Sequence, residues 1–314
     1  GMTTLRPEII LIGGDTDVWR GPVEELIAGR LDSVAIDPDA HLPESLDSDA
    51  VKVMVASPQD AKKFVPYFPN LEWIQSTWAG VDALAGHIPE SVSLTPLRGV
   101  FGQAMSEFVL GWILGLERNI IERARSKSWD ATPEAGVRGK TMGILGTGSI
   151  GSAIAEAVKP LGIKCHGMNS SGQPTAGFAR CFKSNEPKFF EELDYCVAVL
   201  PKTEATDHIL GASAFEAMSN EAIVINVGRG NAIDDDALLQ ALDNNSLRAA
   251  VLDVFTTEPL SEDHRFWQHP RVHITSHTAA PTAIDLVAIA MKDNLERYLA
   301  GDALEGLFAE AKGY

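Results

Sequence analysis

The chain has 314 residues, enough for two ordinary domains, and 45% of the residues are hydrophobic while 22% are charged. This balance is typical of a globular protein with a full core and excludes a disordered chain. The formal net charge of −17 stays negative even with all eight histidines protonated, which argues against nucleic acid and membrane surfaces as partners. A small anionic substrate therefore needs a site built from local positive groups.

Short β-rich runs alternate with helical stretches along almost the whole chain. This alternation predicts βαβ units, and so parallel sheets with helices on their faces. We therefore expect an α/β fold with two doubly wound parallel-sheet domains. The expected strands form two series, which are Ile9–Ile12, Val34–Ile36, Val51–Ala56, Trp73–Ser76 and Val92–Thr95, then Thr141–Leu145, Ile163–Gly167, Tyr195–Leu200, Ala222–Val227, Ala250–Val254 and Val272–Thr275.

Helical spacing appears between the strands, for example in Val23–Arg30, and is longest between the two series. There, apolar residues at i, i+3, i+4 and i+7 predict one helix from about Gln103 to Arg125. Gly111 and Gly115 share a face of this helix, which would let another helix approach closely, either within the chain or in a second subunit. A last helix, Ala283–Leu299, follows the second series, and the pattern alone does not assign it to a domain.

A G-x-G-x-x-G motif follows directly after an apolar strand and opens a helix. Gly146 permits the tight turn, Gly148 lets the backbone approach a pyrophosphate, and Gly151 lets helix and strand pack closely. The free N–H groups of Ser149 and Ile150 in the first helical turn would then face the phosphates. Strand, turn and helix in this order predict a dinucleotide-binding site.

The residue after the second strand of this unit decides which dinucleotide fits. A carboxylate there would accept the ribose hydroxyls and repel a 2′-phosphate, but this chain has Asn169, followed by Ser170 and Ser171. NADP is therefore permitted, and we expect it to be favoured over NAD. No arginine stands among these three residues, and Arg180 and Lys183 are alternative sources of positive charge.

Polar residues follow three consecutive expected strands of the second series. Arg229 follows the first of them, Asp253 and Glu258 lie at and beyond the second, and His277 follows the third. Ligands of open α/β sheets bind beyond the carboxyl ends of the strands, so these groups are expected to converge. A histidine held by a carboxylate suits protonation of a carbonyl oxygen, and an arginine suits a neighbouring carboxylate. The pattern predicts carbonyl reduction.

A series of motifs in a fixed order also resembles a known family. The motifs are Ser76-Thr77-Trp78-Ala79-Gly80-Val81-Asp82, Arg98-Gly99-Val100-Phe101-Gly102-Gln103 with Ser106-Glu107, the glycine motif, Leu200-Pro201-Lys202-Thr203, Asn226-Val227-Gly228-Arg229-Gly230, Asp253-Val254-Phe255-Thr256-Thr257-Glu258-Pro259 and Ser276-His277-Thr278-Ala279-Ala280. Over nearly its whole length the chain resembles the D-isomer-specific 2-hydroxyacid dehydrogenases, in particular their glyoxylate/hydroxypyruvate reductase branch.

The resemblance implies a role for each catalytic residue. His277 would donate the proton and pair with Glu258, while Arg229 would hold the carboxylate and the carbonyl of the substrate. The backbone N–H groups of Ala79 and Gly80 would bind the same carboxylate from the other domain. Asp253 would lie near the nicotinamide amide, and the residues expected to line the cofactor site are Leu200, Pro201, Thr206 and Val227.

The resemblance also implies the domain organisation. A flavodoxin-like substrate domain would comprise residues 1–102 and 283–314, a Rossmann dinucleotide-binding domain would comprise residues 103–282, and the active-site cleft would lie between them. Members of the family are usually homodimers joined through the long helix. Trp129 resembles a tryptophan near the substrate pocket of the reductase branch, although an ordinary packing role is equally open.

We therefore expect an NAD(P)H-dependent reductase of a short 2-oxo acid such as glyoxylate or hydroxypyruvate. A reductase for a bulkier branched or aromatic 2-oxo acid and a dinucleotide-sensing interaction module are the alternatives. Three widely spaced cysteines fit neither a disulfide framework nor a zinc site, which predicts a reduced, cytoplasmic protein with no metal site.

Overall fold

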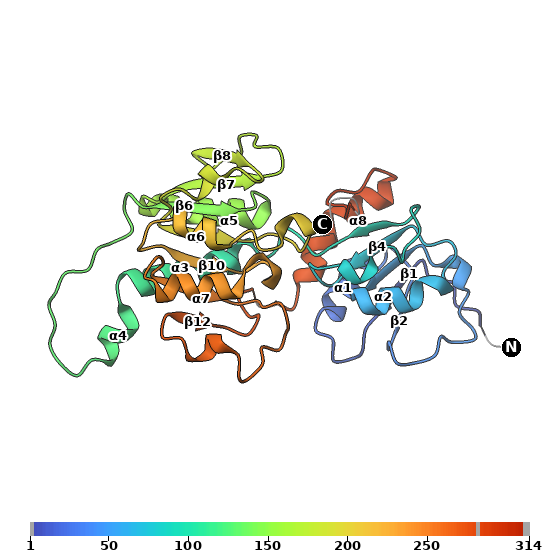
Figure 1. The fold of residues 1–314 in the computed structure, drawn as a ribbon. Coiled ribbons are helices and arrows are strands. Elements are labelled where there is room, and N and C mark those ends of the chain that lie inside the picture. The colour runs from blue at the N-terminus through green and yellow to red at the C-terminus, as the bar shows by residue number, and fades with distance from the viewer. Residues whose placement is uncertain (1–2, 281–282, 310–314) are drawn as a thin grey trace. The chain divides into compact units, whose positions relative to one another are not determined.

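The computed structural model describes residues 3–280 and 283–309 of the chain (Figure 1). It divides into two compact units. The first comprises the described residues of Gly1–Val100 and Thr282–Tyr314, and the second those of Phe101–Pro281. Both units contain a sheet of parallel strands, so the expected α/β class is confirmed.

The first unit is built on a five-stranded sheet in the order β2-β1-β3-β4-β5. The central strands β1, β3 and β4 are buried on both faces, which explains why β1 and β3 are continuous apolar runs instead of alternating patterns. Helix α8 belongs to this unit, because Arg30 near the end of α1 forms an ion pair with Glu296. The elements are β1 Ile9–Ile12, α1 Arg20–Ile27, β2 Ser33–Ile36, β3 Val53–Ala56, α2 Pro58–Phe64, β4 Trp73–Ser76, β5 Ser93–Thr95 and α8 Leu286–Ala300.

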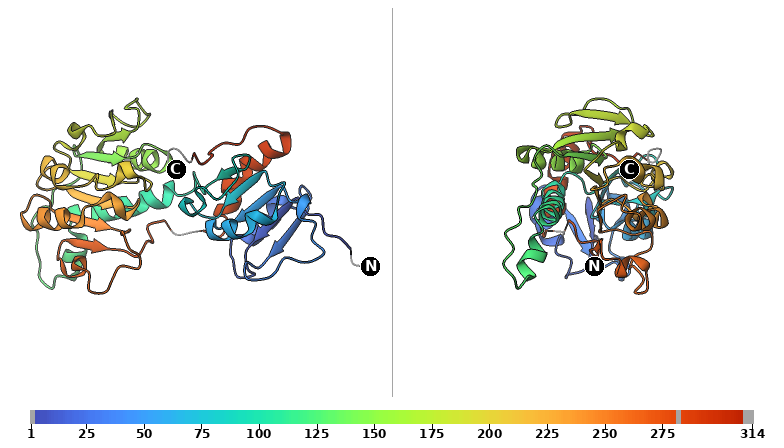
Figure 2. Two further views of the ribbon diagram at one scale, coloured as in Figure 1. Left: turned by 45° about the vertical axis from the view of Figure 1, so that its right-hand side comes forward. Right: turned by 60° about the vertical axis from the view of Figure 1, so that its left-hand side comes forward.

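The second unit is built on a seven-stranded sheet in the order β12-β11-β10-β9-β6-β7-β8. Helices α3 and α5 cover a core on one face and α6 and α7 a core on the other (Figure 2). The strand order reverses between β6 and β9, which is where an open α/β sheet binds its ligand. The elements are α3 Gly102–Glu117, α4 Ile120–Arg125, β6 Thr141–Leu145, α5 Ser149–Val158, β7 Lys164–Asn169, β8 Arg180–Lys183, β9 Tyr195–Ala198, α6 Ala212–Ala217, β10 Ile223–Asn226, α7 Asp235–Asp243, β11 Ala249–Leu252 and β12 Val272–Ile274.

The long helix expected from Gln103 to Arg125 is in fact two helices, so that prediction was wrong. Asn119 has a left-handed backbone conformation with φ of 53°, which ends α3 and starts α4 in a new direction. Asparagine tolerates this conformation better than most residues, and periodicity does not reveal it. A Cβ added at Gly111 or Gly115 would meet nothing within 4 Å, so among the described residues no helix packs on that face.

A buried ionic cluster fixes the end of α3 to the sheet. The carboxylate of Glu117 accepts the phenol hydrogen of Tyr195 at 2.7 Å and forms an ion pair with Arg248 at 3.1 Å. The burial of Tyr195 and the neighbouring Glu117 carboxylate raise the pKa of the phenol far above its ordinary value. A buried carboxylate needs such partners, since its desolvation is costly.

Candidate active site

The glycine motif forms the turn between β6 and α5. Gly146 has a φ of 108° and donates its N–H to the carbonyl of Met168 at 3.0 Å. A Cβ on Gly151 would lie 2.0 Å from the carbonyl oxygen of Gly146, so helix and turn approach too closely for any side chain. At Gly148 an added Cβ would meet nothing within 4 Å, which leaves that backbone open to a ligand.

The first turn of α5 presents unpaired backbone donors. Its N-cap residue Gly148 has no capping side chain. Among the described residues, the N–H groups of Ser149 and Ile150 have no hydrogen-bond acceptor. Donors at a helix N-terminus, together with the helix dipole, favour phosphate oxygens, and the turn therefore fits the pyrophosphate of a dinucleotide.

Alanine substitutions at two glycines separate packing from ligand binding. We expect Gly151→Ala to lower the thermal midpoint of unfolding by several degrees, because the new Cβ collides with the Gly146 carbonyl. Gly148→Ala is expected to leave the midpoint within about a degree but to weaken dinucleotide binding at least tenfold, because a methyl group enters the phosphate space. Thermal unfolding and dinucleotide titration check both, and equal behaviour of the two variants would contradict this reading.

Asn169 closes a turn at the end of β7 with its own side chain. Its Oδ1 accepts the N–H of Gly172 at 2.6 Å, and its Nδ2 donates to Oγ1 of Thr147 at 3.2 Å. Ser170 and Ser171 lie inside this turn and carry no charge. The position that distinguishes the two dinucleotides is thus a neutral turn, and the Asn169 amide shapes it.

His277 and Glu258 form a pair beyond the carboxyl ends of β12 and β11. Nδ1 of His277 lies 2.6 Å from Oε1 of Glu258, and since a carboxylate only accepts, Nδ1 carries the hydrogen. The Oε2 atom of Glu258 accepts the N–H of Phe255 at 3.3 Å. The imidazole is 54% exposed, so its Nε2 is accessible to a substrate.

Asp253 holds the segment that carries His277. Its buried carboxylate accepts the hydroxyl of Thr275 at 2.6 Å and the N–H groups of Thr278 and Ala279 at 2.8 and 3.2 Å. Its carbonyl accepts the N–H of His277 at 2.9 Å. His277 has a φ of 54°, a conformation that is strained for histidine and that these four hydrogen bonds enforce.

Arg229 lies in a tightly enclosed loop after β10. The buried side chain of Asn226 accepts the N–H of Gly228 at 3.1 Å and donates to the carbonyl of Arg229 at 3.0 Å. A Cβ on Gly228 would lie 2.7 Å from the carbonyl of Leu200, and one on Gly230 would lie 1.9 Å from the carbonyl carbon of Phe255. The loop is therefore wedged between those after β9 and β11, and the second of these leads to Glu258.

The loop after β9 carries Leu200, Pro201 and Thr206 of the expected cofactor site, and Val227 lies beside it after β10. The hydroxyl of Thr206 donates to carbonyls of its own turn, those of Pro201 at 3.1 Å and Thr203 at 2.9 Å. It also accepts the N–H of Thr203 at 3.0 Å. Thr206 thus shapes the turn from Thr203 to Asp207.

Ala79 and Gly80 follow β4 in the first unit. The hydroxyl of the buried Ser76 accepts the N–H of Trp78 at 3.0 Å and so starts the turn. The N–H groups of Ala79 and Gly80 have no acceptor among the described residues. Two adjacent free donors suit a carboxylate ligand.

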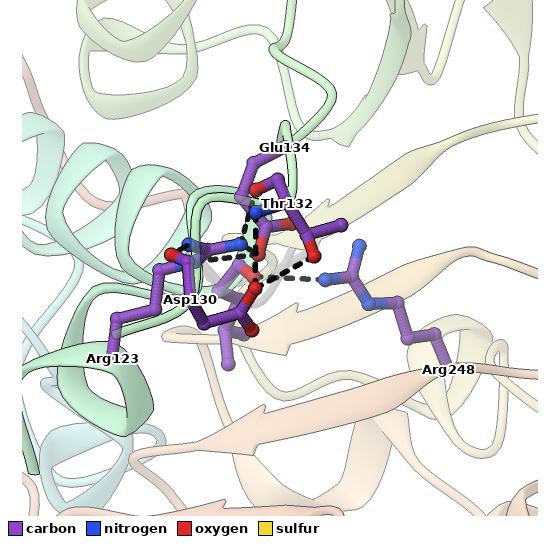
Figure 3. Close-up of polar contacts among 6 residues, drawn as sticks. Arg123, Asp130, Thr132, Glu134 and Arg248 are labelled. Carbon is purple, nitrogen blue, oxygen red and sulfur yellow. Dashed lines mark hydrogen bonds and ion pairs between the residues drawn. The ribbon is translucent and has the colours of Figure 1, made fainter. Parts of the chain in front are cut away.

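Trp129 lies in the loop between α4 and β6, and Arg123 of α4 binds the neighbouring loop residues Asp130, Thr132 and Glu134 (Figure 3). The guanidinium of Arg123 donates to the carboxylate of Glu134 at 2.8 Å and to the carbonyls of Asp130 and Thr132 at 2.9 and 2.5 Å. The indole of Trp129 is nevertheless 97% exposed, so it packs on no other part of the described chain.

Several residues of this region were not singled out by the sequence reasoning. Asn226, Ser76, Thr275 and Asn231 each hold a loop through a side chain, and only their place next to a motif hints at it. Within residues 3–280 and 283–309, no cluster of three or more metal-ligating side chains occurs. No helix in the same ranges has the length and apolar character needed to cross a membrane.

Comparison with known proteins identifies the family. The model of the D-isomer specific 2-hydroxyacid dehydrogenase NAD-binding domain matches residues 110–279. Glyoxylate/hydroxypyruvate reductase A of Serratia proteamaculans is 32% identical over 258 residues, which cover 78% of this chain and 82% of the relative.

Two solved structures share the fold over nearly the full chain. A D-isomer specific 2-hydroxyacid dehydrogenase of Xanthobacter autotrophicus in complex with NADPH and MES has a TM-score of 0.86 at 28% identity, covering 98% of this chain and 100% of that one. An NADPH-dependent glyoxylate/hydroxypyruvate reductase of Sinorhizobium meliloti, in complex with NADP and sulfate, has a TM-score of 0.81 at 26% identity, covering 98% of this chain and 99% of that one. The chain therefore belongs to the D-isomer specific 2-hydroxyacid dehydrogenase family and is an oxidoreductase that reduces 2-oxo acids.

Proposed function

We propose that the protein reduces a short 2-oxo acid of the glyoxylate or hydroxypyruvate type to the D-2-hydroxy acid, with NADPH as the preferred reductant. The observation that carries the proposal is the His277–Glu258 pair at 2.6 Å, beyond a strand end next to the enclosed Arg229 loop. Relatives named glyoxylate/hydroxypyruvate reductase support the choice of substrate.

The proton and the hydride reach the substrate from different groups. NADPH, when bound at the glycine motif, supplies a hydride to the carbonyl carbon. Nε2 of His277 donates a proton to the carbonyl oxygen, so the carbonyl group becomes an alcohol and the imidazole becomes neutral. Glu258 accepts the hydrogen on Nδ1, which orients the ring and leaves Nε2 as the atom that donates the proton.

The carboxylate of the substrate needs positive groups on a chain with a net charge of −17. Arg229 offers a planar fork that binds a carboxylate and an adjacent carbonyl oxygen. The free N–H groups of Ala79 and Gly80 are a second set of donors that suits a carboxylate. We assign these three residues to substrate binding, and Asp253 to holding the His277 segment beside the nicotinamide.

The neutral turn after β7 supports NADPH over NADH. Asn169 pairs in register with Lys183 of β8, and a Cβ on Gly172 would lie 3.1 Å from that of Lys183. The exposed Lys183 thus stands beside the turn where a 2′-phosphate would lie. Arg180 stacks over the ring of Phe182 at 4.3 Å and lies about 10 Å farther back along the strand. Between the two alternatives, we therefore assign the positive charge to Lys183.

Neutralising Lys183 tests this cofactor assignment. We expect Lys183→Gln to raise the KM for NADPH about tenfold and to leave the KM for NADH unchanged, because only NADPH carries the 2′-phosphate. Arg180→Gln is the matched control and should change neither value. Initial rates with both dinucleotides check this, and an unchanged NADPH value in Lys183→Gln would remove Lys183 from the site.

We also propose a homodimer that forms through α3, α4 and the loop of Trp129. Ile120, Ile121 and Trp129 are 49%, 59% and 97% exposed, and the face of Gly111 and Gly115 is open. An apolar surface of this kind is typical of a protein interface. In such a dimer Trp129 would lie against the partner subunit. There it would help to enclose the substrate that the partner subunit binds. Sedimentation equilibrium, which measures the molar mass, tests the assembly.

The three cysteines support a place in the cytoplasm. Cys165, Cys181 and Cys196 are free thiols, and burial raises the pKa of Cys165 to about 12. Thiols that remain unpaired are usual in a reducing compartment.

An assay of nicotinamide oxidation tests the proposed reaction. NADPH and NADH are supplied in parallel with glyoxylate, hydroxypyruvate, pyruvate, 2-oxoisovalerate and phenylpyruvate. We expect the highest kcat/KM with NADPH and one of the two short acids. A preference for 2-oxoisovalerate or phenylpyruvate would show that the substrate is a bulkier branched or aromatic 2-oxo acid. Dinucleotide binding without turnover of any acid would favour a sensing module.

A further inference from the structure

Two loops that flank the proposed cofactor site run side by side in the second unit. The segment after β9 includes the turn from Thr203 to Asp207, and the segment after β10 continues from Arg229 into a short turn, Gly230–Ala232. Backbone hydrogen bonds join them, from the N–H of His208 to the carbonyl of Asn231 at 2.8 Å and from Leu210 to Ala232 at 2.9 Å.

The side chain of Asn231 reaches across from the second segment to the first. Its Nδ2 donates to Oδ1 of Asp207 at 2.6 Å and to Oγ1 of Thr206 at 3.1 Å, and it lies 3.5 Å from the carbonyl of Thr203. These three acceptors fix the orientation of the amide, because a flipped amide would put its own oxygen against the Asp207 carboxylate. Asn231 is thus the centre of a lock between the two loops.

The oxygen of the same amide makes this arrangement unfavourable in free energy, apart from the contacts of Nδ2. Oδ1 of Asn231 is buried and has no hydrogen-bond donor among the described residues. A buried acceptor without a partner is destabilising, and such groups are rare in native structures. Packing alone therefore does not explain why residue 231 is an asparagine. The two hydrogen bonds that its Nδ2 donates to Thr206 and Asp207 do explain it.

The two loops differ in how well they are held without the lock. The Arg229 loop is also fixed by Asn226 and by its close approaches to Leu200 and Phe255. The turn from Thr203 to Asp207 is largely exposed, and its other side-chain bonds reach only to the turn itself and to the preceding Pro201. Loss of Asn231 would therefore release this turn and leave the Arg229 loop in place.

We propose that Asn231 is a positioning residue that locks the Thr203–Asp207 turn against the Arg229 loop and so preforms one wall of the dinucleotide site. This inference rests on the proposed function, since the turn follows the Leu200 and Pro201 lining of that site. Asn231 acts through the turn and does not touch the reacting atoms.

The first test compares variants for cofactor affinity and turnover. Asn231→Ala and Asn231→Asp are expected to raise the Kd of NADPH about fivefold to twentyfold, while kcat at saturating NADPH stays within about twofold. This split between binding and turnover is not produced by general destabilisation. An unchanged Kd in both variants would overturn the inference and leave the proposed function intact, whereas a native protein that binds neither NADPH nor NADH would overturn both.

A second readout needs no dinucleotide. Lys202 is exposed and precedes the turn, so trypsin cleavage after it reports on the release of the turn. We expect the fragment ending at Lys202 to appear at least fivefold faster in Asn231→Asp than in the native protein, with cleavage at other sites unchanged. Equal rates would contradict the lock.

Exchanging the side chains of Asn231 and Asp207 tests whether NADPH affinity can be restored. Asn231→Asp places two carboxylates in contact, whereas Asp207→Asn alone keeps an acceptor facing the amide and should be nearly silent. The double substitution Asn231→Asp with Asp207→Asn restores a donor and an acceptor in reversed order. Recovery of NADPH affinity to within about threefold of the native value is expected, and a double variant as impaired as Asn231→Asp would refute the pairing.

Discussion

Substitution of His277 by alanine is expected to lower kcat by roughly 10² to 10⁴ while the Kd of the dinucleotide stays nearly unchanged. The imidazole is the group that donates a proton to the carbonyl oxygen in our mechanism, and general acid catalysis contributes about that factor. The dinucleotide site at the glycine motif does not include His277. Single-turnover rates and dinucleotide titration, measured on the same preparation, check the two halves of the prediction.

The chain offers a matched control for this experiment. His269 also pairs with a carboxylate, since its Nε2 lies 2.9 Å from Oδ1 of Asp243, but this pair is between α7 and the segment before β12. His269→Ala should therefore leave kcat unchanged. Glu258→Gln should lower kcat less than His277→Ala does, because the ring keeps its proton donor but loses the charge that holds it. Full turnover in His277→Ala would remove this histidine from the mechanism.

The sheets and the strand ends were predictable because parallel strands leave a strong local signal. Buried strands such as β3 and β10 are apolar runs between turn residues, and each ended within two residues of its expected position. Once the strands are known, the carboxyl edge follows from the topology. The sequence alone therefore predicts that His277 and Glu258 meet at this edge.

The elements that were missed lack such a signal. Strand β8 has four residues of which two are charged and exposed, and its place is set by its pairing with β7. The break between α3 and α4 depends on the backbone conformation of one residue, Asn119, within an otherwise continuous helical period. Neither a short edge strand nor a left-handed residue can be read from hydrophobic periodicity.

The roles of polar side chains were predictable only where a residue faces outward from a strand end. Asn169, Thr206 and Asp253 were expected at the cofactor site, and the structure adds that the first two side chains close local turns and that the carboxylate of Asp253 holds three protein donors. A sequence shows that a polar group is present but not which neighbour engages it. The hydrogen bonds that hold the loops of the site can therefore be identified only in the structure.

Substitution of Arg229 by alanine is expected to lower kcat/KM for the 2-oxo acid by about 10² to 10⁴. The guanidinium would make two hydrogen bonds to charged or polarised oxygens, each worth about 1.5–3 kcal/mol, and about 1.4 kcal/mol corresponds to a factor of ten. The loop itself should persist, because Asn226 and the close approaches of Gly228 and Gly230 hold its backbone without the side chain. Steady-state kinetics with varied 2-oxo acid measure the effect.

Two further variants separate charge from geometry at this position. Arg229→Lys keeps the positive charge but loses the planar fork, so it should recover only about a tenth or less of the native kcat/KM. Arg265→Ala removes an exposed arginine from the same unit and should have no effect, which controls for the change in net charge. Because the chain as a whole repels anions, the positive charge of Arg229 is expected to offset that repulsion locally. A normal kcat/KM in Arg229→Ala would place the substrate carboxylate elsewhere.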